Sequence, residues 1–368
     1  MKKFNILLVL LILTISSFAQ APNWLWAKKF GGTSKSVSTD ASGNVFVTGF
    51  FSGPTITLGT TTLTNAGSNT YDFFLVKYDP QGNVLWAKSA GGPSHDQGNS
   101  ITIDMNGNVF VTGYFQDSTI TFGSITLTSP GTSKVFLVKY DPSGNAIWAK
   151  CSKGNSNAIG NSIFFNVNGN ILITGFFNSN SIIFGSDTLT NSNFSGRSDI
   201  FFVNYDASGN VLWAKRAGSG LFDDIGTDIT RDASGNIFII GTFNSPEIVF
   251  GADTLKNVKN TSGATDLFIV KYDNSGNYLW AKRAGGTSVD NVWSVSTDSK
   301  GDIFITGNFI SSITFGSYPL TSNGSYDFFI AKYNTLGKVL WAKGAGAVKN
   351  ADGGQSLTID ASDNVLVT

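Results

Sequence analysis

The chain is poor in the residues that most often carry chemistry. Its 368 residues include one cysteine (Cys151), one histidine (His95) and one glutamate (Glu247), beside 24 aspartates. A single cysteine excludes an intrachain disulfide, and a single histidine excludes a zinc site with several His and Cys ligands. His95 is interpreted as an ordinary loop residue within GGPSHDQGN, and Cys151 as a neutral substitution at a strand end.

An excess of charge of either sign is also absent. The 25 basic and 25 acidic residues give a net charge of zero, so no nucleic-acid partner is predicted. Aspartate favours turns and glutamate favours helix interiors, so the near absence of glutamate argues against much helix. With 42 glycines and 30 phenylalanines, the composition indicates an all-β fold.

The one long apolar run lies at the N-terminus. MKKFNILLVLLILTISSFAQ has two lysines, an apolar run over residues 6–15 and small residues before Ala19. This pattern is typical of a secretory signal peptide at residues 1–19. A transmembrane helix needs about 20 apolar residues, and this run is shorter. We therefore expect a protein that is secreted or held at the outer cell surface, with no membrane span after cleavage.

An eleven-residue sequence is repeated along the chain. Near copies of YDPSGNAIWAK begin at Tyr78, Tyr140, Tyr205, Tyr272 and Tyr333. Six tryptophans open a WAK sequence at spacings of 60, 62, 65, 67 and 61 residues (Trp26, Trp86, Trp148, Trp213, Trp280 and Trp341). Such a period indicates one supersecondary unit per repeat, and tryptophans present in every copy indicate packing within that unit.

One unit can be read over residues 99–150. Residues 99–104, 109–115, 134–140 and 146–150 read as strands one to four, and residues 118–129 as an inserted hairpin. In DPSGN, Asp141 and Pro142 suit the first positions of a type I turn, and Gly144 suits a following left-handed position. Each unit is therefore predicted to be a four-stranded antiparallel sheet.

Strand three is apolar on both faces. Phe73 and Leu75 point to one side of the sheet, and Phe74 and Val76 to the other. Both faces must be covered, and neighbouring copies can do this by packing radially as the blades of a β-propeller. A linear β-solenoid is the alternative, although it usually lacks two antiparallel hairpins per repeat. We expect an all-β propeller domain over residues 20–368.

The two ends of this domain hold incomplete blades. NWLWAKKFGG reads as a strand four, and QSLTIDASDNVLVT as strands one and two, so five complete blades lie between two partial ones. We expect a sequence truncated at its C-terminus and a ring left open beside it. Final blade numbers of six and of seven both remain open.

Two patterns resemble a known family. DxxGNVxVTG and DxF[LIF]VKYDxxGNxxWAKxxGG are similar to the SBBP (seven-bladed β-propeller) repeat, over essentially residues 23–368. The resemblance implies a β-propeller of the kind found in secreted or surface proteins of bacteria. It implies no catalytic residues, because the family motif marks structure.

Two kinds of residue are candidates for ligand binding. Aspartates lie at one equivalent place before strand one, on one face of the ring (Asp96, Asp224, Asp290 and Asp352). They could bind a cation or sugar hydroxyls, or each could accept backbone N–H bonds within its own loop. Trp293 breaks the repeat and is the second candidate, because a specific site is expected where the repeat is broken.

The DxxGN turns superficially resemble calcium loops. Such loops need several oxygen ligands at alternating positions, whereas each turn here offers one aspartate. Each aspartate is therefore interpreted as capping its own turn, no metal ligands are assigned, and calcium is the only cofactor left open.

The favoured function is a non-enzymatic binding or structural module that takes a protein or carbohydrate ligand on one face of the ring. One alternative is a polysaccharide-active glycosidase or lyase, for which Asp223 and Glu247 are the best remaining carboxylates. Another is a structural spacer within a larger exported protein.

Overall fold

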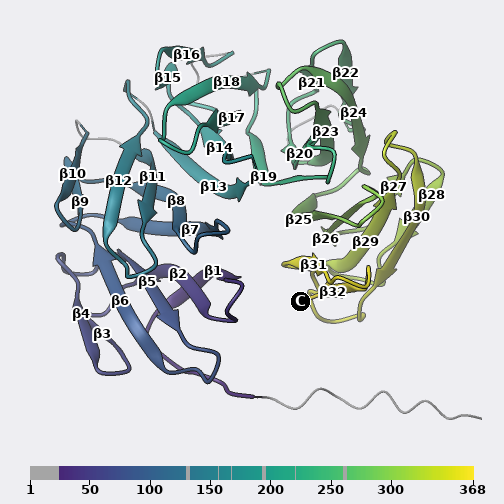
Figure 1. Cartoon of the computed structure of the whole chain (residues 1–368). Helices are drawn as coiled ribbons and strands as arrows, with labels where there is room; N and C mark the ends of the chain where they lie inside the picture. Colours follow the sequence, from purple (N-terminus) through teal and green to yellow (C-terminus); the bar gives the residue numbers. More distant parts are fainter. Residues whose placement is uncertain are drawn as a thin grey trace, which may run out of the picture.

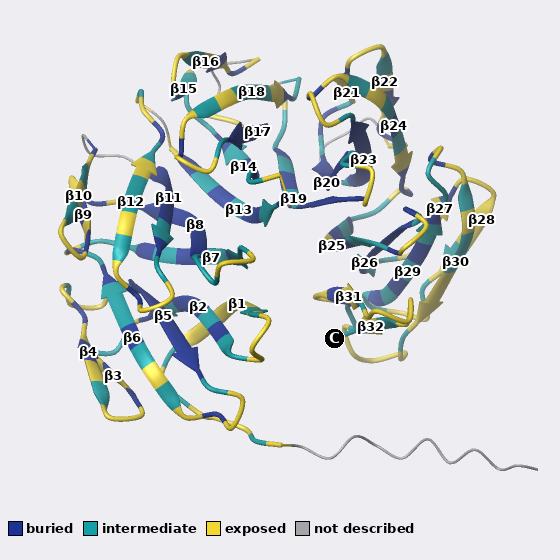
Figure 2. Ribbon diagram, viewed as in Figure 1, coloured by how far each residue is buried: buried dark blue, intermediate teal, exposed yellow. Residues whose placement is uncertain are grey.

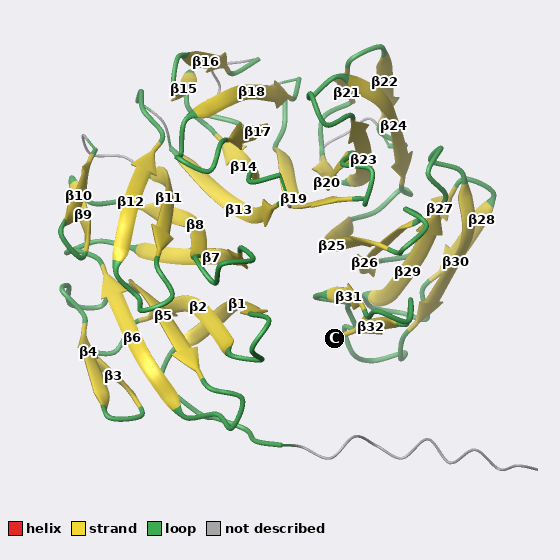
Figure 3. Ribbon diagram, in the orientation of Figure 1, coloured by secondary structure: helices red, strands yellow, loops and turns green. Residues whose placement is uncertain are grey.

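The fold is a ring of antiparallel sheets packed face to face around a central axis (Figure 1). The computed structural model describes residues 25–129, 133–155, 157–166, 168–192, 196–219, 221–259 and 263–368. All regular elements in these ranges are strands (Figure 3), so none of them is a helix that could cross a bilayer. The expected signal peptide at residues 1–19 lies outside the described residues.

Five blades are complete, and each pairs its strands in chain order from the axis outward. The first has β1 (Thr33–Thr39), β2 (Val45–Phe51), β5 (Asp72–Tyr78) and β6 (Val84–Ala90). The second has β7 (Asp96–Ile103), β8 (Val109–Phe115), β11 (Lys134–Tyr140) and β12 (Ala146–Cys151). The third has β13 (Ala158–Phe165), β14 (Ile171–Phe177), β17 (Asp199–Tyr205) and β18 (Val211–Ala217). The fourth has β19 (Asp224–Arg231), β20 (Ile237–Phe243), β23 (Asp266–Tyr272) and β24 (Tyr278–Ala284). The fifth has β25 (Asp290–Thr297), β26 (Ile303–Phe309), β29 (Asp327–Tyr333) and β30 (Val339–Ala345).

Each complete blade also carries the inserted hairpin on the outer rim of the ring (Figure 1). These hairpins are β3–β4 (Thr55–Leu58, Thr61–Thr64), β9–β10 (Thr119–Phe122, Ile125–Thr128), β15–β16 (Ser181–Phe184, Asp187–Thr190), β21–β22 (Glu247–Phe250, Asp253–Lys256) and β27–β28 (Ser312–Phe315, Tyr318–Thr321). The unit predicted over residues 99–150 is confirmed, including its hairpin.

The turn between strands three and four has the predicted chemistry. Gly144 has φ of 81°, and its N–H donates to the Asp141 carbonyl at 3.0 Å. The Asp141 carboxylate accepts from the N–H groups of Ser143 and Asn145, so it caps its own turn. The Asp141 N–H in turn donates to the Asn145 carbonyl at 2.9 Å, so Gly144 is the extra residue of the bulge that closes a type I turn. A separate register shift leaves Ile147 unpaired further along strand four.

The core lies between the blades rather than inside any one of them. Phe73 and Leu75 of the first blade pack with Val109 and Val111 of the second. Phe74 belongs to the cluster on the opposite face of the same sheet. All residues of β5 are buried, and so are all residues of β17 and β23 (Figure 2). The prediction that strand three is covered on both faces is therefore confirmed.

The WAK tryptophans join neighbouring blades. The Trp86 ring lies 5.9 Å from that of Phe46 in its own blade, and its Nε1 donates to the Pro142 carbonyl in the next blade's turn at 3.1 Å. Trp280 likewise donates to the Thr335 carbonyl at 3.3 Å. A tryptophan that contacts both its own blade and the next is needed in every copy, and this explains why the WAK sequence recurs.

The ring is open beside the C-terminus, as predicted. β31 (Leu357–Ile359) and β32 (Val365–Val367) form a two-stranded sheet in which Val365 pairs with Ile359. Figure 1 shows a gap between this pair and the first blade. On the other side of the gap, Trp26 lies against Tyr78 with ring centroids 5.7 Å apart.

In the four blades whose strand three begins with a buried aspartate, strand four is followed by a glycine whose missing Cβ leaves space for that carboxylate. A Cβ on Gly285 would lie 2.1 Å from Oδ1 of Asp266. That carboxylate cannot move aside easily, because Oδ2 accepts from the Val258 N–H and from Arg283, each at 3.0 Å. The same overlap recurs at the other junctions with a strand-three aspartate (Gly91 with Asp72, Gly218 with Asp199, and Gly346 with Asp327).

We predict that Gly285→Ala destabilises the protein by about 1–3 kcal/mol, the usual cost of overpacking a well-packed site. Gly31→Ala is the matched control, because a Cβ there meets no described atom within 4 Å. Urea unfolding of both variants measures the difference. Equal stability of the two variants would contradict the steric role of Gly285.

Candidate functional site in the central channel

The innermost strand of each blade carries a bulge that leaves one residue unpaired. In β7, Gly98 pairs with Gly113 and Ser100 with Thr112, so Asn99 has no partner across the ladder. The equivalent unpaired residues are Lys35, Asn161, Thr227 and Trp293. Bulges redirect side chains, and here each redirects one residue of the strand that lines the axis (Figure 1).

The glycine in strand two makes this bulge sterically feasible. A Cβ on Gly113 would lie 1.9 Å from the Gln97 carbonyl oxygen, and the equivalent glycine of every complete blade is similarly close to strand one. The repeated TG sequence (IG in the fourth blade) therefore allows strand one to bulge. The glycine is required by backbone proximity, since no side chain could fit there.

The five bulge residues help to line one cavity of about 390 Å³. Its volume lies within the range of about 300–1,000 Å³ that is usual for small-ligand pockets. The lining residues come from all five complete blades and are Lys35, Gln97, Asn99, Tyr114, Ile159, Asn161, Phe176, Ile225, Thr227 and Trp293.

Sequence varies from blade to blade at these channel positions. Strand three and its turn are nearly the same in every blade, whereas the bulge position holds Lys, Asn, Asn, Thr and Trp in successive blades. Tyr114 and Phe176, on strand two, are followed by Thr242 and Asn308 at the same position. The scaffold therefore repeats while the cavity that it encloses does not.

Two amides of the cavity are held in fixed orientations. Asn99 Nδ2 donates to the Gly160 carbonyl at 2.9 Å, and Asn161 Nδ2 donates to the Gly226 carbonyl at 2.8 Å. Each bond joins the innermost strands of neighbouring blades. The hydrogen bond from Nδ2 fixes the orientation of each amide, and its oxygen is the acceptor of the side chain.

Asp228 is a channel-side carboxylate that sequence reasoning missed. It follows the bulge at a position that holds Ser36, Ser100, Ser162 and Ser294 in the other complete blades. Ser162 Oγ donates to its Oδ1 at 2.5 Å, and the Val295 N–H donates to its Oδ2 at 2.9 Å. Asp228 thus ties three blades together beside the axis. Aligning the repeats would have found it as the one acid among serines.

Trp293, the candidate that breaks the repeat, lies at the bulge of β25, and ligand binding by it stays a prediction. Its side chain lines the cavity and is 38% exposed. The tryptophans of the WAK sequences instead pack between blades. Tryptophan is large and amphipathic, so an exposed one on a cavity wall is suited to contact a ligand.

The candidate aspartates have a different setting. Asp96, Asp224 and Asp290 are fully buried and are not among the residues that line the cavity. Asp96 accepts from the Gly92 N–H, and Asp290 from the Gly286 N–H, each at 2.9 Å. This geometry fits the alternative in which each carboxylate stabilises its own loop. The aspartates do not line the cavity because side chains alternate along a strand: Asp96 faces the blade junction, and its neighbour Gln97 faces the channel.

Ligand binding by these aspartates stays a prediction. Ser245 Oγ donates to Asp224 at 2.8 Å, and the Ala347 N–H donates to the partly exposed Asp352 at 2.8 Å. Any ligand would have to compete with these partners.

At these blade junctions, the strand-one aspartate lies near the strand-three aspartate of the preceding blade. Burial raises the pKa of Asp290 to about 8, and the nearby Asp266 carboxylate contributes to that rise. Burial likewise raises the pKa of Asp96 to about 8 and of Asp224 to about 7. Where the strand-three aspartate is replaced by Lys134, the strand-one aspartate is also replaced, by Ala158. This joint loss indicates that the two carboxylates depend on one another.

The carboxylates of the enzymatic alternative are not brought together at the channel. Asp223 forms an ion pair with Arg197 at 3.2 Å and accepts from the Ser198 N–H. Glu247 opens the outer hairpin strand β21, where it pairs with Lys256 across the ladder. Within the described ranges, no group of three or more His, Cys, Asp or Glu side chains is arranged to hold a metal ion.

Comparisons with known proteins support the architecture. Residues 85–114 match the family model SBBP, described as a beta-propeller repeat. The chain carries an SBBP β-propeller repeat. The matched residues run from β6 through β7 to β8, so the SBBP match spans the first blade junction and includes Asp96, Gln97 and Asn99.

Two curated proteins are similar to this SBBP-repeat chain. An uncharacterized WD repeat-containing protein, L264, of Acanthamoeba polyphaga mimivirus is 26% identical over 81% of the chain. The regulatory protein FlaEY of Caulobacter vibrioides is 23% identical over 50% of the chain. The chain spans only 26% and 19% of the lengths of these relatives.

Two solved structures are also similar. A Dyadobacter fermentans protein of unknown function has a TM-score of 0.41 at 11% identity, covering 74% of this chain and 71% of that one. Sqt1 from Chaetomium thermophilum has a TM-score of 0.43 at 10% identity, covering 89% of this chain and 75% of that one.

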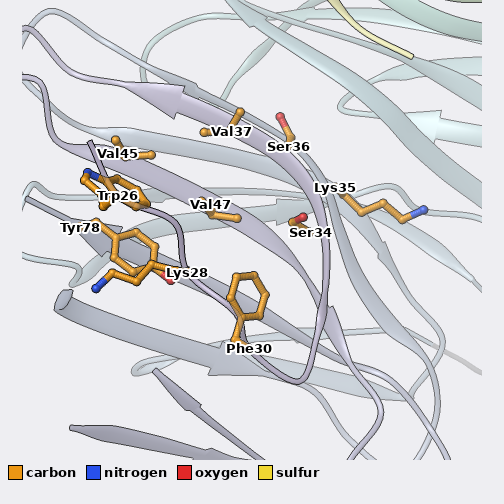
Figure 4. A pocket seen from close by; sticks show the side chains of 10 residues that line it. All are labelled: Trp26, Lys28, Phe30, Ser34, Lys35, Ser36, Val37, Val45, Val47 and Tyr78. Atoms are coloured by element: carbon orange, nitrogen blue, oxygen red, sulfur yellow. The ribbon is translucent and has the colours of Figure 1, made fainter. Parts of the chain in front are cut away.

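A second cavity, of about 350 Å³, lies on the open face of the first blade (Figure 4). Val37, Val45 and Val47 line it beside Trp26 and Tyr78, whose rings are tilted by 34°. The equivalent residues of the second blade, Ile101, Val109 and Val111, are buried against the first blade. This cavity is therefore the sheet face that a preceding blade would cover. Lys35 also borders it, but its amine extends away from the aromatic pair in Figure 4.

We predict that Asp290 makes the protein less stable as the pH rises from about 4 to about 8. Its folded pKa of about 8 lies above the ordinary 3.8, so the folded state binds the proton more tightly. The resulting stabilisation is fully present below the unfolded pKa and is lost as the pH rises through the folded pKa. One such group contributes at most about 1.4 kcal/mol per pH unit.

Unfolding measured across this pH range tests the prediction. Asp290→Asn should reduce the slope without abolishing it, because Asp96 and Asp224 also have raised pKa values. Asp223→Asn is the control, since its side chain is 41% exposed in a surface ion pair. An Asp290→Asn variant with the wild-type slope would show the prediction to be wrong.

Proposed function

We propose that this protein is a binding module that holds a ligand in its central channel and does not transform it. The observation that carries the proposal is the convergence of the variable bulge residues on one cavity. A purely structural repeat has no need to vary selectively where its blades meet at the axis. A binding site requires such variation, because unlike groups must face one ligand.

The lining of the cavity supports binding rather than catalysis. It combines three aromatic rings, of Tyr114, Phe176 and Trp293, with three amides, of Gln97, Asn99 and Asn161. Glycoside hydrolysis normally uses two carboxylates on either side of the scissile bond. The residues that line this cavity include neither aspartate nor glutamate.

The setting of the module is also part of the proposal. The N-terminal pattern of residues 1–19 supports export, so we place the ligand outside the cell, in solution or on a neighbouring surface. One curated relative carries WD repeats, which is consistent with a propeller used for binding.

Trp293→Ala is the variant that tests this proposal. Loss of an exposed aromatic from a ligand contact should weaken binding at least about tenfold, or about 1.4 kcal/mol. Wild-type and variant protein would be screened against glycan and peptide arrays, and affinities then measured for every ligand found. Tyr318→Ala is the control, because Tyr318 is a comparably exposed aromatic (36%) on an outer hairpin.

The expected result is that Tyr318→Ala keeps the wild-type affinity and Trp293→Ala loses it. If both variants bind as the wild type does, the ligand does not sit in the central cavity and the proposal fails. It also fails if neither array yields a ligand.

A further inference from the structure

The central cavity has a single charged group in its lining. Lys35 comes from the bulge of the first blade and is exposed. Its Nζ lies 5.7 Å from the centroid of the Phe50 ring, which is a cation–π distance. No acidic side chain is among the lining residues, and the channel-side Asp228 carboxylate is occupied by hydrogen bonds from Ser162 and the Val295 N–H. Lys35 is therefore the charged group that the cavity offers a ligand, which favours an anionic one.

The remaining polar groups suit a ligand rich in hydroxyls. One N–H of each of the Asn99 and Asn161 amides is bonded to a neighbouring blade, which fixes the orientation of the amide and of its acceptor oxygen. Hydroxyl groups can donate to such acceptors, whereas an isolated phosphate or carboxylate cannot. A ligand that carries both an anionic group and hydroxyls would use Lys35 and the two amides together.

Aromatic faces complete the arrangement. Trp293, from the fifth complete blade, presents a large exposed ring on the cavity wall to which Lys35 contributes from the first blade. From Lys35 outward, aromatic rings continue through Phe50 to Tyr71 and then His95, with centroids 4.6 Å and 4.4 Å apart. These three rings pack on one another outside the cavity lining, so Trp293 is the exposed ring on which the C–H face of a sugar can pack.

We propose that the cavity binds the end of an acidic carbohydrate, a uronic-acid-containing glycan. The uronate carboxylate pairs with Lys35, its hydroxyls donate to Asn99 and Asn161, and a C–H face packs on Trp293. This inference rests on the proposed function, since it names the ligand class of the same site.

Titration calorimetry of the full chain tests the ligand class. The probes are oligogalacturonate, the neutral maltooligosaccharide of the same length, and an acidic peptide with the same number of carboxylates. Oligogalacturonate should bind at least about tenfold more tightly than either of the other two, and added salt should weaken it.

Two variants locate the charge and the stacking surface. Lys35→Gln should reduce uronate affinity about tenfold and remove most of its salt dependence, while Lys349→Gln, an exposed lysine distant in sequence, should change neither. Trp293→Ala should reduce affinity for the uronate by a similar factor. Thermal unfolding of each variant checks that the fold is retained.

The outcomes separate this inference from the proposed function. If a neutral glycan or the peptide binds better, and Trp293→Ala abolishes that binding, the acidic-carbohydrate inference is overturned while the central binding site stands. If uronate binds but neither Lys35→Gln nor Trp293→Ala weakens it, both proposals fail. Failure of oligogalacturonate to bind at all overturns the inference directly.

Discussion

The structure depends on the burial of sheets that are apolar on both faces. A strand such as β17, in which every residue is buried, cannot exist in a single exposed sheet. Each large apolar side chain contributes roughly 1.5–3 kcal/mol when it is fully buried. Stacking the blades around an axis covers both faces of every inner strand except at the opening of the ring. The uncovered valines beside Trp26 show what one blade leaves exposed without its neighbour.

The same constraint separates the scaffold from the site. Strand three and the WAK tryptophans are fixed by contacts to the next blade, so they repeat nearly unchanged. The innermost strand packs against a blade on each side and borders the channel. Its bulge residue faces the channel and therefore takes no part in the apolar core between the blades. A glycine in strand two allows the bulge, and the bulge turns a freely variable residue toward the axis. Binding residues can therefore differ from blade to blade without disturbing the core.

Much of the architecture could be predicted from the sequence because turns and strand periodicity are local. The strands at residues 109–115 and 134–140 were predicted with their observed bounds, and the open ring followed from counting partial repeats. The bulge could not be predicted, because it depends on register between two strands. The repeat alone therefore points to Asp96, whereas Gln97 and Asn99 line the cavity, because one position along a strand reverses the side that a residue faces. Trp293 is a candidate from the sequence because a break in the repeat is visible without the register.

Hydrogen exchange resolved by strand tests most directly whether stacking of two-faced sheets holds the protein together. The backbone amides of a buried third strand, such as β17 or β23, should exchange with solvent only through global unfolding. Those of β31 and β32, beside the opening of the ring, should exchange much faster. If β17 and β23 exchanged as readily as β31 and β32, face-to-face packing of the blades would not be the source of stability.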